Sequence, residues 1–372
     1  MTHSPADLRW MALALALGRR ALGRSWPNPA VGAVVVRDGR VLGRGWTQPG
    51  GRPHAETMAL KAADEQSPDA TRGASVYVTL EPCAHHGQTP PCAEALIRAG
   101  VARVVTALTD PDPRVAGRGH QMLRAAGVAV TEGCRAAEAR FDQAGFLSRV
   151  TRNRPMVTLK LASSFDGRIA TESGESRWIT GPEARRYVHY LRATHDAVMV
   201  GSGTSRADDP NLLVRDLGEV GQPLRVVCDT HLVSNPDGRL GQGAATNPVV
   251  LCIGAHAGAA EQAAWRARGA RLLVCKTTPV GHLDLDDVLG RLADLGVTRV
   301  FCEGGGGLAA GLLGRGLVDR LVGFTAGLVL GAEGRASVAP LPRRSLADHA
   351  RFSLVESRAL GGDVVHIWEK QG

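Results

Sequence analysis

The chain has 372 residues, of which 44% are hydrophobic and 4% aromatic, and its formal net charge is +8. This length exceeds the usual size of one domain, so we expect two domains that each bury a core. The composition excludes a fibrous or disordered protein. Acidic residues are interleaved with the basic ones and no basic run stands out, so the charge reflects either a solvated surface or attraction of an anionic substrate.

The first 23 residues predict a helix rather than a targeting segment. Leu8, Met11 and Leu15 recur at helical spacing, and the segment lacks the basic n-region of a signal peptide. No apolar run approaches the roughly 20 residues that a membrane span needs. We therefore expect a cytoplasmic protein without a membrane partner.

Strands and helices alternate over the first part of the chain. The predicted strands are 30–36, 41–46, 75–80, 103–109 and 128–133, and the predicted helices are 6–23, 54–65, 92–100 and 120–127. This alternation predicts a three-layer α/β domain. The polar, Arg-rich segment 148–155 is typical of a domain boundary, so we place the first domain at 1–148 and the second at 153–372.

The second part of the chain starts a new alternation and is also predicted to be α/β. The predicted strands are 156–164, 197–201, 224–229, 248–254, 271–275 and 299–303, and the predicted helices are 259–269, 285–296 and 308–316. The alternating segments 352–360 and 363–369 predict a closing β-hairpin.

Two of the seven cysteines have a distinctive context. Cys83 and Cys92 flank the stiff segment AHHGQTPP, and upstream lies His54-Ala55-Glu56 at the start of a predicted helix. One histidine and two cysteines are three ligands that suit zinc, and the fourth tetrahedral position stays open for water, as in catalytic sites. Glu56 can reach the same site without being a ligand and can transfer protons. The alternatives are a structural zinc and buried thiols.

These residues resemble the zinc nucleobase deaminases, whose pattern is H-x-E followed by P-C-x-x-C. Here eight residues, not two, separate the cysteines, and EPCAHHGQTPPC resembles the riboflavin-pathway pyrimidine deaminases almost letter for letter. The resemblance implies that Asn28 contacts the substrate, although Asn beside Pro is also a frequent turn former. His85 and His86 are interpreted as loop residues that contact substrate or lie at the surface.

The second part contains a glycine-rich turn that predicts an anion site. In CEGGGGLAAGLL a strand ends at Glu303 and four glycines, 304–307, precede a helix, where free backbone amides attract phosphate. Gly201-Ser202-Gly203 also follows a strand, but the third glycine of the Rossmann spacing is absent.

Together with KLASSFDGRIAT, SGESRWIT and VGSGTSRADDPNLLVR, this turn resembles the reductase domain of bacterial riboflavin biosynthesis over about residues 155–335. The resemblance implies a dihydrofolate-reductase-like fold that binds NADPH. The residues that it places at NADPH are Ala162 or Ser163, Trp178, Thr204, Asp208, Gly305, Gly306 and Gly307. The residues that it places at the substrate are Lys160, Ser176, Arg192, Leu212, Arg215 and Glu303. Guanidinium groups bind phosphate in a bidentate manner, which suits Arg192 and Arg215.

Plainer interpretations remain for three of these positions. Trp178 could be a core residue, Arg192 a solvated charge on a helix, and the Asp208 segment a turn. Lys160 and Asp208 are the titratable groups expected to have a polar role in the reduction.

The order of the two domains resembles the bifunctional enzyme family of the riboflavin pathway. The resemblance implies zinc-dependent deamination of 2,5-diamino-6-ribosylamino-4(3H)-pyrimidinone 5′-phosphate and NADPH-dependent reduction to 5-amino-6-ribitylamino-uracil 5′-phosphate. The implied partner is this phosphorylated pyrimidine rather than nucleic acid, and a homo-oligomer is compatible with the sequence. An RNA-editing deaminase and a non-catalytic zinc-stabilised nucleotide-binding protein are the alternatives.

Overall fold

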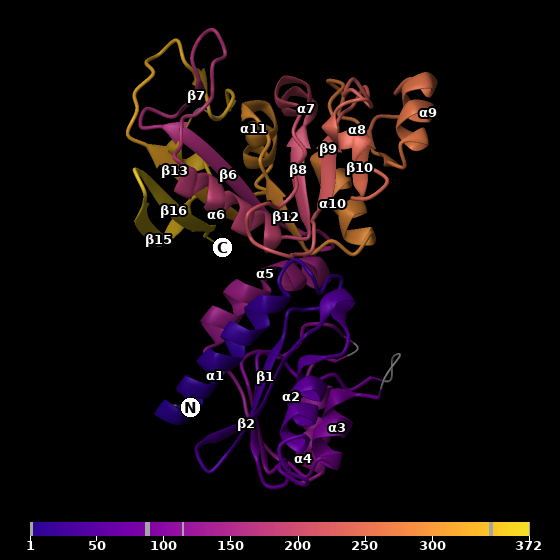
Figure 1. Ribbon diagram of the computed structural model, residues 1–372, viewed down its shortest axis with the longest axis vertical. Helices are drawn as coiled ribbons and strands as arrows, with labels where there is room; N and C mark the ends of the chain where they lie inside the picture. The colour runs from indigo at the N-terminus through magenta and orange to yellow at the C-terminus, as the bar shows by residue number, and fades with distance from the viewer. Residues whose placement is uncertain (1–2, 86–89, 114, 342–344, 372) are drawn as a thin grey trace. The chain divides into compact units, whose positions relative to one another are not determined.

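The computed structural model describes residues 3–85, 90–113, 115–341 and 345–371. The chain folds as two compact units, Met1–Asn153 and Arg154–Gly372 (Figure 1). Each unit is built on its own sheet. In the described part of the chain, no helix combines the length and the apolar character needed to cross a bilayer.

The described residues of unit 1 form a five-stranded sheet of order β2-β1-β3-β4-β5. The strands are β1 (Gly32–Arg37), β2 (Arg40–Trp46), β3 (Ser75–Val78), β4 (Arg103–Thr106) and β5 (Ala129–Thr131). β1 is antiparallel to both β2 and β3, whereas β3, β4 and β5 are parallel. The mixed sheet results because β1 and β2 form a hairpin, while helical crossovers join the strands that follow.

Helices cover both faces of this sheet, as the sequence predicts. They are α1 (Pro5–Gly18), α2 (Ala55–Asp64), α3 (Cys92–Arg98), α4 (Arg118–Ala125) and α5 (Ala136–Arg152), with 3-10 turns at Arg19–Ala21 and Pro49–Gly51. Figure 1 shows α2, α3 and α4 on one side of β1 and β2, whereas α1 and α5 lie on the other side and contact each other. The sequence pattern does not predict α5, which includes the first five residues of the segment assigned to the domain boundary.

Glycines in β2 bring α2 unusually close to the sheet. A Cβ atom at Gly45 would lie 2.2 Å from the carbonyl oxygen of Ala55, and one at Gly43 would lie 2.0 Å from that of Ala59. Only a residue without a side chain allows this approach. The close packing fixes the first turn of α2, where two of the candidate site residues lie.

Unit 2 is built on a nine-stranded sheet, counted over its described residues, of order β11-β10-β9-β8-β12-β6-β13-β16-β15. The strands are β6 (Met156–Ser164), β8 (Ala197–Gly201), β9 (Leu224–Cys228), β10 (Val249–Ile253), β11 (Arg271–Val274), β12 (Arg299–Cys302), β13 (Arg320–Ala326), β15 (Phe352–Leu360) and β16 (Asp363–Lys370). The strands from β11 to β13 are parallel, and β16 is antiparallel to β13 and β15. The predicted closing hairpin is therefore confirmed. A separate pair joins β7 (Arg168–Ala170) and β14 (Arg335–Ala336).

The helices of unit 2 join these parallel strands. They are α6 (Pro182–Ala193), α7 (Ser202–Asp208), α8 (Arg239–Gln242), α9 (Ala259–Ala267), α10 (Leu285–Asp294) and α11 (Gly306–Gly314), and a 3-10 turn spans Leu346–Asp348. One apolar cluster packs α6 and α9 against alternate residues of the sheet, including Phe301 and Phe324.

The carboxyl ends of the parallel strands form one edge of this sheet. In Figure 1 the end of β8 leads into α7 and the end of β12 lies near the start of α11. In open α/β sheets this edge is where ligands bind. Thr204, Glu303 and the glycines Gly305, Gly306 and Gly307 all follow strands at this edge.

Candidate active sites

The three predicted zinc ligands of unit 1 lie together. His54 caps the amino end of α2, Cys92 is the first residue of α3, and Cys83 lies in the loop after β3. The Nδ1 atom of His54 is 3.3 Å from the Sγ atom of Cys92 and 3.8 Å from that of Cys83. One ligand atom from each residue lies within 4.8 Å of the others, so the three can hold one metal ion.

The loop and α3 hold the two thiols at this separation. The backbone N–H of Cys92 donates to the Sγ atom of Cys83 at 3.2 Å, and that of Ala93 donates to the carbonyl oxygen of Cys83 at 3.2 Å. Free amides at the start of a helix stabilise a thiolate. The metal-binding form of Cys83 is therefore favoured by the fold itself.

The pKa values of the cysteine pair move apart. Hydrogen bonds from Cys92 and His54 lower the pKa of Cys83 to about 4, although burial opposes this. The hydrogen bond with Cys83, together with burial, raises the pKa of Cys92 well above its usual value. The hydrogen bond with Cys83 also raises the pKa of His54. The pair thus shares one negative charge. Zinc binds cysteine as the thiolate, so a zinc ion would stabilise the second thiolate and release its proton.

Glu56 lies in the first turn of α2 and is 4% exposed. Burial raises its pKa to about 7, while the neighbouring His54 acts to lower it. A carboxyl group that titrates near neutrality is suited to accept and return a proton at physiological pH. The position of Glu56 beside the triad fits the proton-transfer role predicted from the sequence.

The remaining predicted residues of this site have different surroundings. Asn28 is half-buried, and a Cβ atom at Gly51 would lie 1.9 Å from its Nδ2 atom, so the Asn28 amide packs on the loop that leads to His54. The Nδ1 atom of His85 is buried and has no hydrogen-bond partner among the described residues. His86 lies outside the described residues.

In unit 2, three of the predicted substrate residues form a buried charged cluster. The Nε and Nη2 atoms of Arg192, on α6, donate to the Oε1 and Oε2 atoms of Glu303 at 2.5 and 3.1 Å. The two side chains are 13% and 10% exposed, so Arg192 is not a solvated surface charge. Burial acts to raise the pKa of Glu303, but the charge and hydrogen bonds of Arg192, together with Lys160, hold it below its usual value.

Lys160 projects from β6 beside this ion pair. Burial lowers its pKa, although Glu303 opposes the effect, and Arg192 and Asp208 also influence it. A lysine of lowered pKa can hold or release a proton closer to neutral pH than an exposed lysine can. The cluster therefore offers a titratable amine next to a paired carboxylate.

The predicted cofactor residues divide between the carboxyl edge and the surface. The Oγ1 atom of Thr204 accepts a hydrogen bond from the backbone N–H of Gly305 at 3.1 Å, which links α7 to the start of α11. Gly305 caps α11, and Gly306 and Gly307 are its first two residues. Asp208 is the exposed last residue of α7, so this position belongs to a helix end rather than to a free turn.

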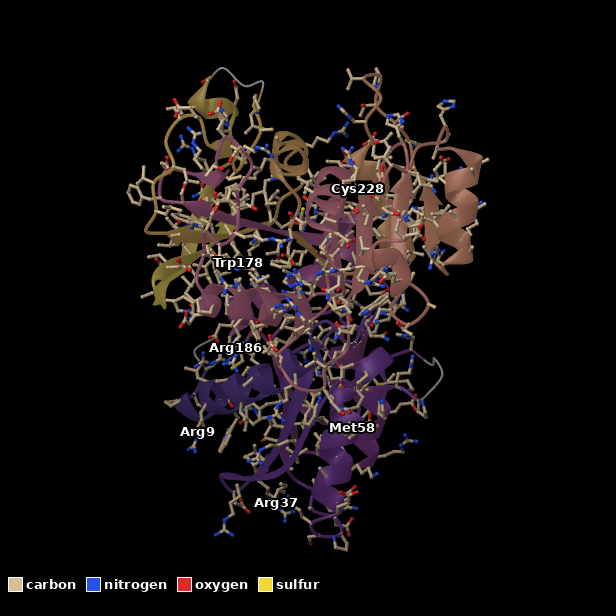
Figure 2. All side chains as sticks on the ribbon, turned by 45° about the horizontal axis from the view of Figure 1, so that its top comes forward. Arg9, Arg37, Met58, Trp178, Arg186 and Cys228 are labelled. Atoms are coloured by element: carbon tan, nitrogen blue, oxygen red, sulfur yellow. The ribbon has the colours of Figure 1, made fainter. Side chains whose placement is uncertain are left out.

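Trp178, which is labelled in Figure 2, is 69% exposed, and this excludes the interpretation as a core residue. The guanidinium carbon of Arg185 lies 4.4 Å from the centroid of its ring, and the neighbouring Ser176 is also exposed. An exposed indole ring beside an arginine is available to a planar ligand.

Ala162 and Ser163 project to opposite faces of the sheet. Ala162 packs against the apolar cluster that contains Phe324, whereas Ser163 lines a cavity of about 310 Å³ together with Thr325 and His366. Successive side chains of a strand alternate between faces. The two side chains therefore lie on different faces of the sheet, and contact of either residue with the cofactor stays a prediction.

The structure also reveals residues that the sequence analysis does not single out. His189 lies one turn before Arg192 on α6 and is 8% exposed, and its Nδ1 atom accepts a hydrogen bond from the backbone N–H of Arg215 at 3.2 Å. Gln222 precedes β9 and bonds to the backbone of Val214. Helical spacing from Arg192 is a signal that could have found His189, whereas no sequence pattern marks Gln222.

Comparison with known proteins finds a different family match in each of the two units. The family model for the cytidine and deoxycytidylate deaminase zinc-binding region matches residues 4–108, and the model for the RibD C-terminal domain matches residues 155–366. The riboflavin biosynthesis protein RibD of Escherichia coli is 40% identical over 370 residues, which cover 96% of this chain and 98% of that protein. The corresponding protein of Aquifex aeolicus is 37% identical over 98% of both chains.

Solved structures give the same result. Acinetobacter baumannii RibD has a TM-score of 0.86 at 36% identity, over 99% of both chains. A structure from Thermotoga maritima, described as a diaminohydroxyphosphoribosylaminopyrimidine deaminase/5-amino-6-(5-phosphoribosylamino)uracil reductase, has a TM-score of 0.86 at 31% identity. It covers 98% of this chain and 99% of that one.

Fold, site and comparisons thus define a bifunctional enzyme in which a zinc-type deaminase domain precedes a reductase domain. More particularly, the chain belongs to the RibD family of riboflavin biosynthesis proteins. The α/β fold class predicted for both parts of the chain is confirmed.

Proposed function

We propose that this enzyme deaminates 2,5-diamino-6-ribosylamino-4(3H)-pyrimidinone 5′-phosphate and then reduces the product to 5-amino-6-ribitylamino-uracil 5′-phosphate. The observation that carries the proposal is the grouping of His54, Cys83 and Cys92 within 4.8 Å beside the buried Glu56. The printed description of the Thermotoga maritima relative supports the choice of substrate. We assign deamination to residues 1–148 and reduction to residues 153–372.

In the deamination, His54, Cys83 and Cys92 would hold zinc. When bound there, zinc supplies a Lewis acid that activates water at neutral pH. Glu56 would take a proton from the attacking water and deliver it to the leaving nitrogen. The C–N bond of the ring amidine breaks, a C=O bond forms, and ammonia leaves. Asn28 would bind the pyrimidine, because its amide lies on the loop that leads to His54.

In the reduction, the ribosyl ring would open to an imine between C1′ and the exocyclic nitrogen. When bound, NADPH supplies the hydride for C1′, while a proton joins the nitrogen. Thr204, Asp208, Trp178, Gly305, Gly306, Gly307 and either Ala162 or Ser163 would bind the cofactor. Lys160, Ser176, Arg192, Leu212, Arg215 and Glu303 would bind the substrate. Of these, Lys160, whose pKa burial lowers although Glu303 opposes the effect, is proposed for the polar step.

Arg192 and Arg215 have different parts in this proposal. Arg192 is committed to Glu303 and orients that carboxylate. Arg215 is exposed, and its guanidinium group would bind the 5′-phosphate in a bidentate manner.

A cytoplasmic location belongs to the proposal, because thiols that must bind a metal need a reducing compartment and all seven cysteines are free. The proposal also includes association into a homo-oligomer, which analytical ultracentrifugation tests.

Mass spectrometry of the pyrimidine after incubation with zinc-loaded enzyme tests the function. Without NADPH we expect replacement of an NH group by oxygen. With NADPH we expect the further addition of two hydrogen atoms. If neither change occurs with folded, zinc-loaded enzyme, the proposed substrate is wrong.

A further inference from the structure

The segment 211–215, between α7 and β9, is held by side chains rather than by secondary structure. Gln222 holds its centre, because the Oε1 atom accepts from the backbone N–H of Val214 at 2.7 Å and the Nε2 atom donates to the carbonyl oxygen of Val214 at 3.2 Å. One amide side chain thereby satisfies both polar groups of a single residue, as a neighbouring strand would.

Side chains of α6 form hydrogen bonds with the backbone of the two residues that flank Val214. The Nη1 atom of Arg192 donates to the carbonyl oxygen of Leu213 at 2.9 Å, and the Nδ1 atom of His189 accepts from the backbone N–H of Arg215 at 3.2 Å. Burial and the charges of Arg192 and Arg215 lower the pKa of His189, so the ring is neutral and Nδ1 is free to accept. Three consecutive residues are thus fixed by three different side chains.

The start of the segment is fixed as well. Arg225, which is fully buried on β9, donates to the carbonyl oxygen of Asn211 at 3.3 Å. Leu212 is buried and has a positive φ of 57°. A bulky residue in this region of backbone space persists where its surroundings over-determine it, which is typical of ligand-binding segments.

The side chain of Arg215 contrasts with this tightly held backbone. The Arg215 side chain is exposed, and its guanidinium group makes no hydrogen bond or ion pair with another described residue. Its neighbour Arg192, by comparison, is committed to Glu303 and to the backbone of Leu213. A fixed backbone that presents a free guanidinium group is the arrangement that favours a bidentate anion contact, since less freedom is lost on binding.

We propose that Gln222 and His189 are positioning residues for the 5′-phosphate of the reductase substrate, which they serve by fixing the backbone from which Arg215 reaches the phosphate. The inference rests on the proposed function and extends it to the recognition of one substrate group. Neither residue touches the reacting atoms in this account. Their loss should therefore weaken the binding of the phosphorylated compound and leave the chemical step largely intact.

The test compares two substrates in steady-state reduction: 5-amino-6-(5-phosphoribosylamino)uracil and its dephosphorylated counterpart. Gln222→Met keeps the length of the side chain and removes both hydrogen bonds. His189→Leu removes the acceptor, while His189→Asn restores an acceptor near the position of Nδ1. The matched control is Gln262→Met on α9, where the amide donates to the carbonyl oxygen of Ala257 at 2.9 Å in another part of unit 2.

For the phosphorylated compound we expect KM to rise about tenfold in Gln222→Met and in His189→Leu, with kcat changed less than about twofold. His189→Asn should recover most of the loss, and Gln262→Met should resemble the wild type. KM for NADPH and KM for the dephosphorylated compound should not change. A general structural role would instead alter all of these constants.

Three results would overturn the inference. They are an equal loss on both compounds, a loss confined to kcat, and a wild type that binds both compounds equally well. In each case reduction by the wild-type enzyme would leave the proposed function standing. If the wild type reduces neither compound, the proposed function fails and the inference fails with it.

Discussion

Unit 1 takes its proposed zinc ligands and Glu56 from one stretch of chain, residues 54–92, whereas unit 2 draws on β6, α6, the segment before β9 and the end of β12. In unit 1 the proposed zinc ligands lie at the starts of two helices and in the loop before the second. In unit 2 the charged groups meet only because the parallel sheet brings distant segments to one edge. The residues of the first site can be predicted from their spacing in the sequence, whereas the grouping of the residues of the second site depends on the whole fold.

The largest predicted effect separates the two units. Cys92→Ala removes one of the three proposed metal ligands, so we expect zinc binding and deamination to be lost. Reduction of the deaminated intermediate should stay within about twofold of wild type, because the residues proposed for that step all lie in unit 2. Metal analysis, ammonia release and NADPH consumption measure the three quantities.

Cys134→Ala provides the matched control for that variant, since Cys134 is a buried thiol of unit 1 outside the metal group. It should retain zinc and both activities. Loss of both activities in a folded Cys92→Ala protein would contradict the separation of the sites.

The second prediction concerns the buried ion pair of unit 2. Glu303→Gln leaves Arg192 without its charged partner, so we expect the free energy of unfolding of unit 2 to fall by about 3 kcal/mol. Reduction should also be impaired, while deamination should not. Urea unfolding together with the two activity assays checks both expectations.

Glu356→Gln is the control for the ion pair, because Glu356 pairs with Arg358 at the surface and both side chains are more than 40% exposed. Removal of such a pair typically costs less than about 1 kcal/mol. If the two variants lose equal stability, the buried pair has no special role.

The smallest predicted effect lies at the start of unit 1. Asp7, on α1, is 4% exposed and accepts hydrogen bonds from Arg103 and from the hydroxyl group of Tyr77 at 3.0 Å. Burial acts to raise the pKa of Asp7, but hydrogen bonds, above all those from Arg103, lower it to about 2.

The pH dependence follows from the sign of this shift. The folded pKa lies below the unfolded value of about 3.9, so the stabilisation of about 2 kcal/mol is fully present above pH 4 and is lost as the pH falls through 2. Asp7→Asn should therefore destabilise unit 1 at pH 6, and its difference from wild type should shrink between pH 4 and pH 2. Asp69→Asn, at an exposed pair with Arg72, should show no such trend. A difference that is constant with pH would exclude the carboxylate charge as its cause.

What could be predicted from sequence differs between the two units in the same way. His54, Glu56, Cys83 and Cys92 could be grouped from sequence because three of them lie at helix starts and Cys83 lies in the loop that leads to one. The alternating strands could also be recognised, since apolar runs bounded by glycine and proline carry that information locally.

Long-range features could not be predicted. The pairing of Arg192 with Glu303 and the hold of Gln222 on Val214 join segments that only the folded sheet brings together. Strand alternation puts the side chains of Ala162 and Ser163 on opposite faces of the sheet, but it does not tell which of the two contacts the cofactor. α5 escaped prediction because charged residues interrupt its apolar ones and its last residues belong to the Arg-rich segment interpreted as a boundary.

The most direct test of the two-site division uses Glu56→Gln, which keeps the three proposed zinc ligands and removes the proposed proton carrier. The zinc-loaded variant is incubated with NADPH in two reactions. One contains the diaminopyrimidinone ribosyl phosphate and the other contains its deaminated product, and the masses of the products are measured. The account predicts that zinc content is unchanged, that deamination slows by about 10²-fold or more, and that the deaminated compound is reduced at the wild-type rate. Deamination at an undiminished rate, or loss of reduction in the folded variant, would contradict the central claim that two separate sites divide the chemistry.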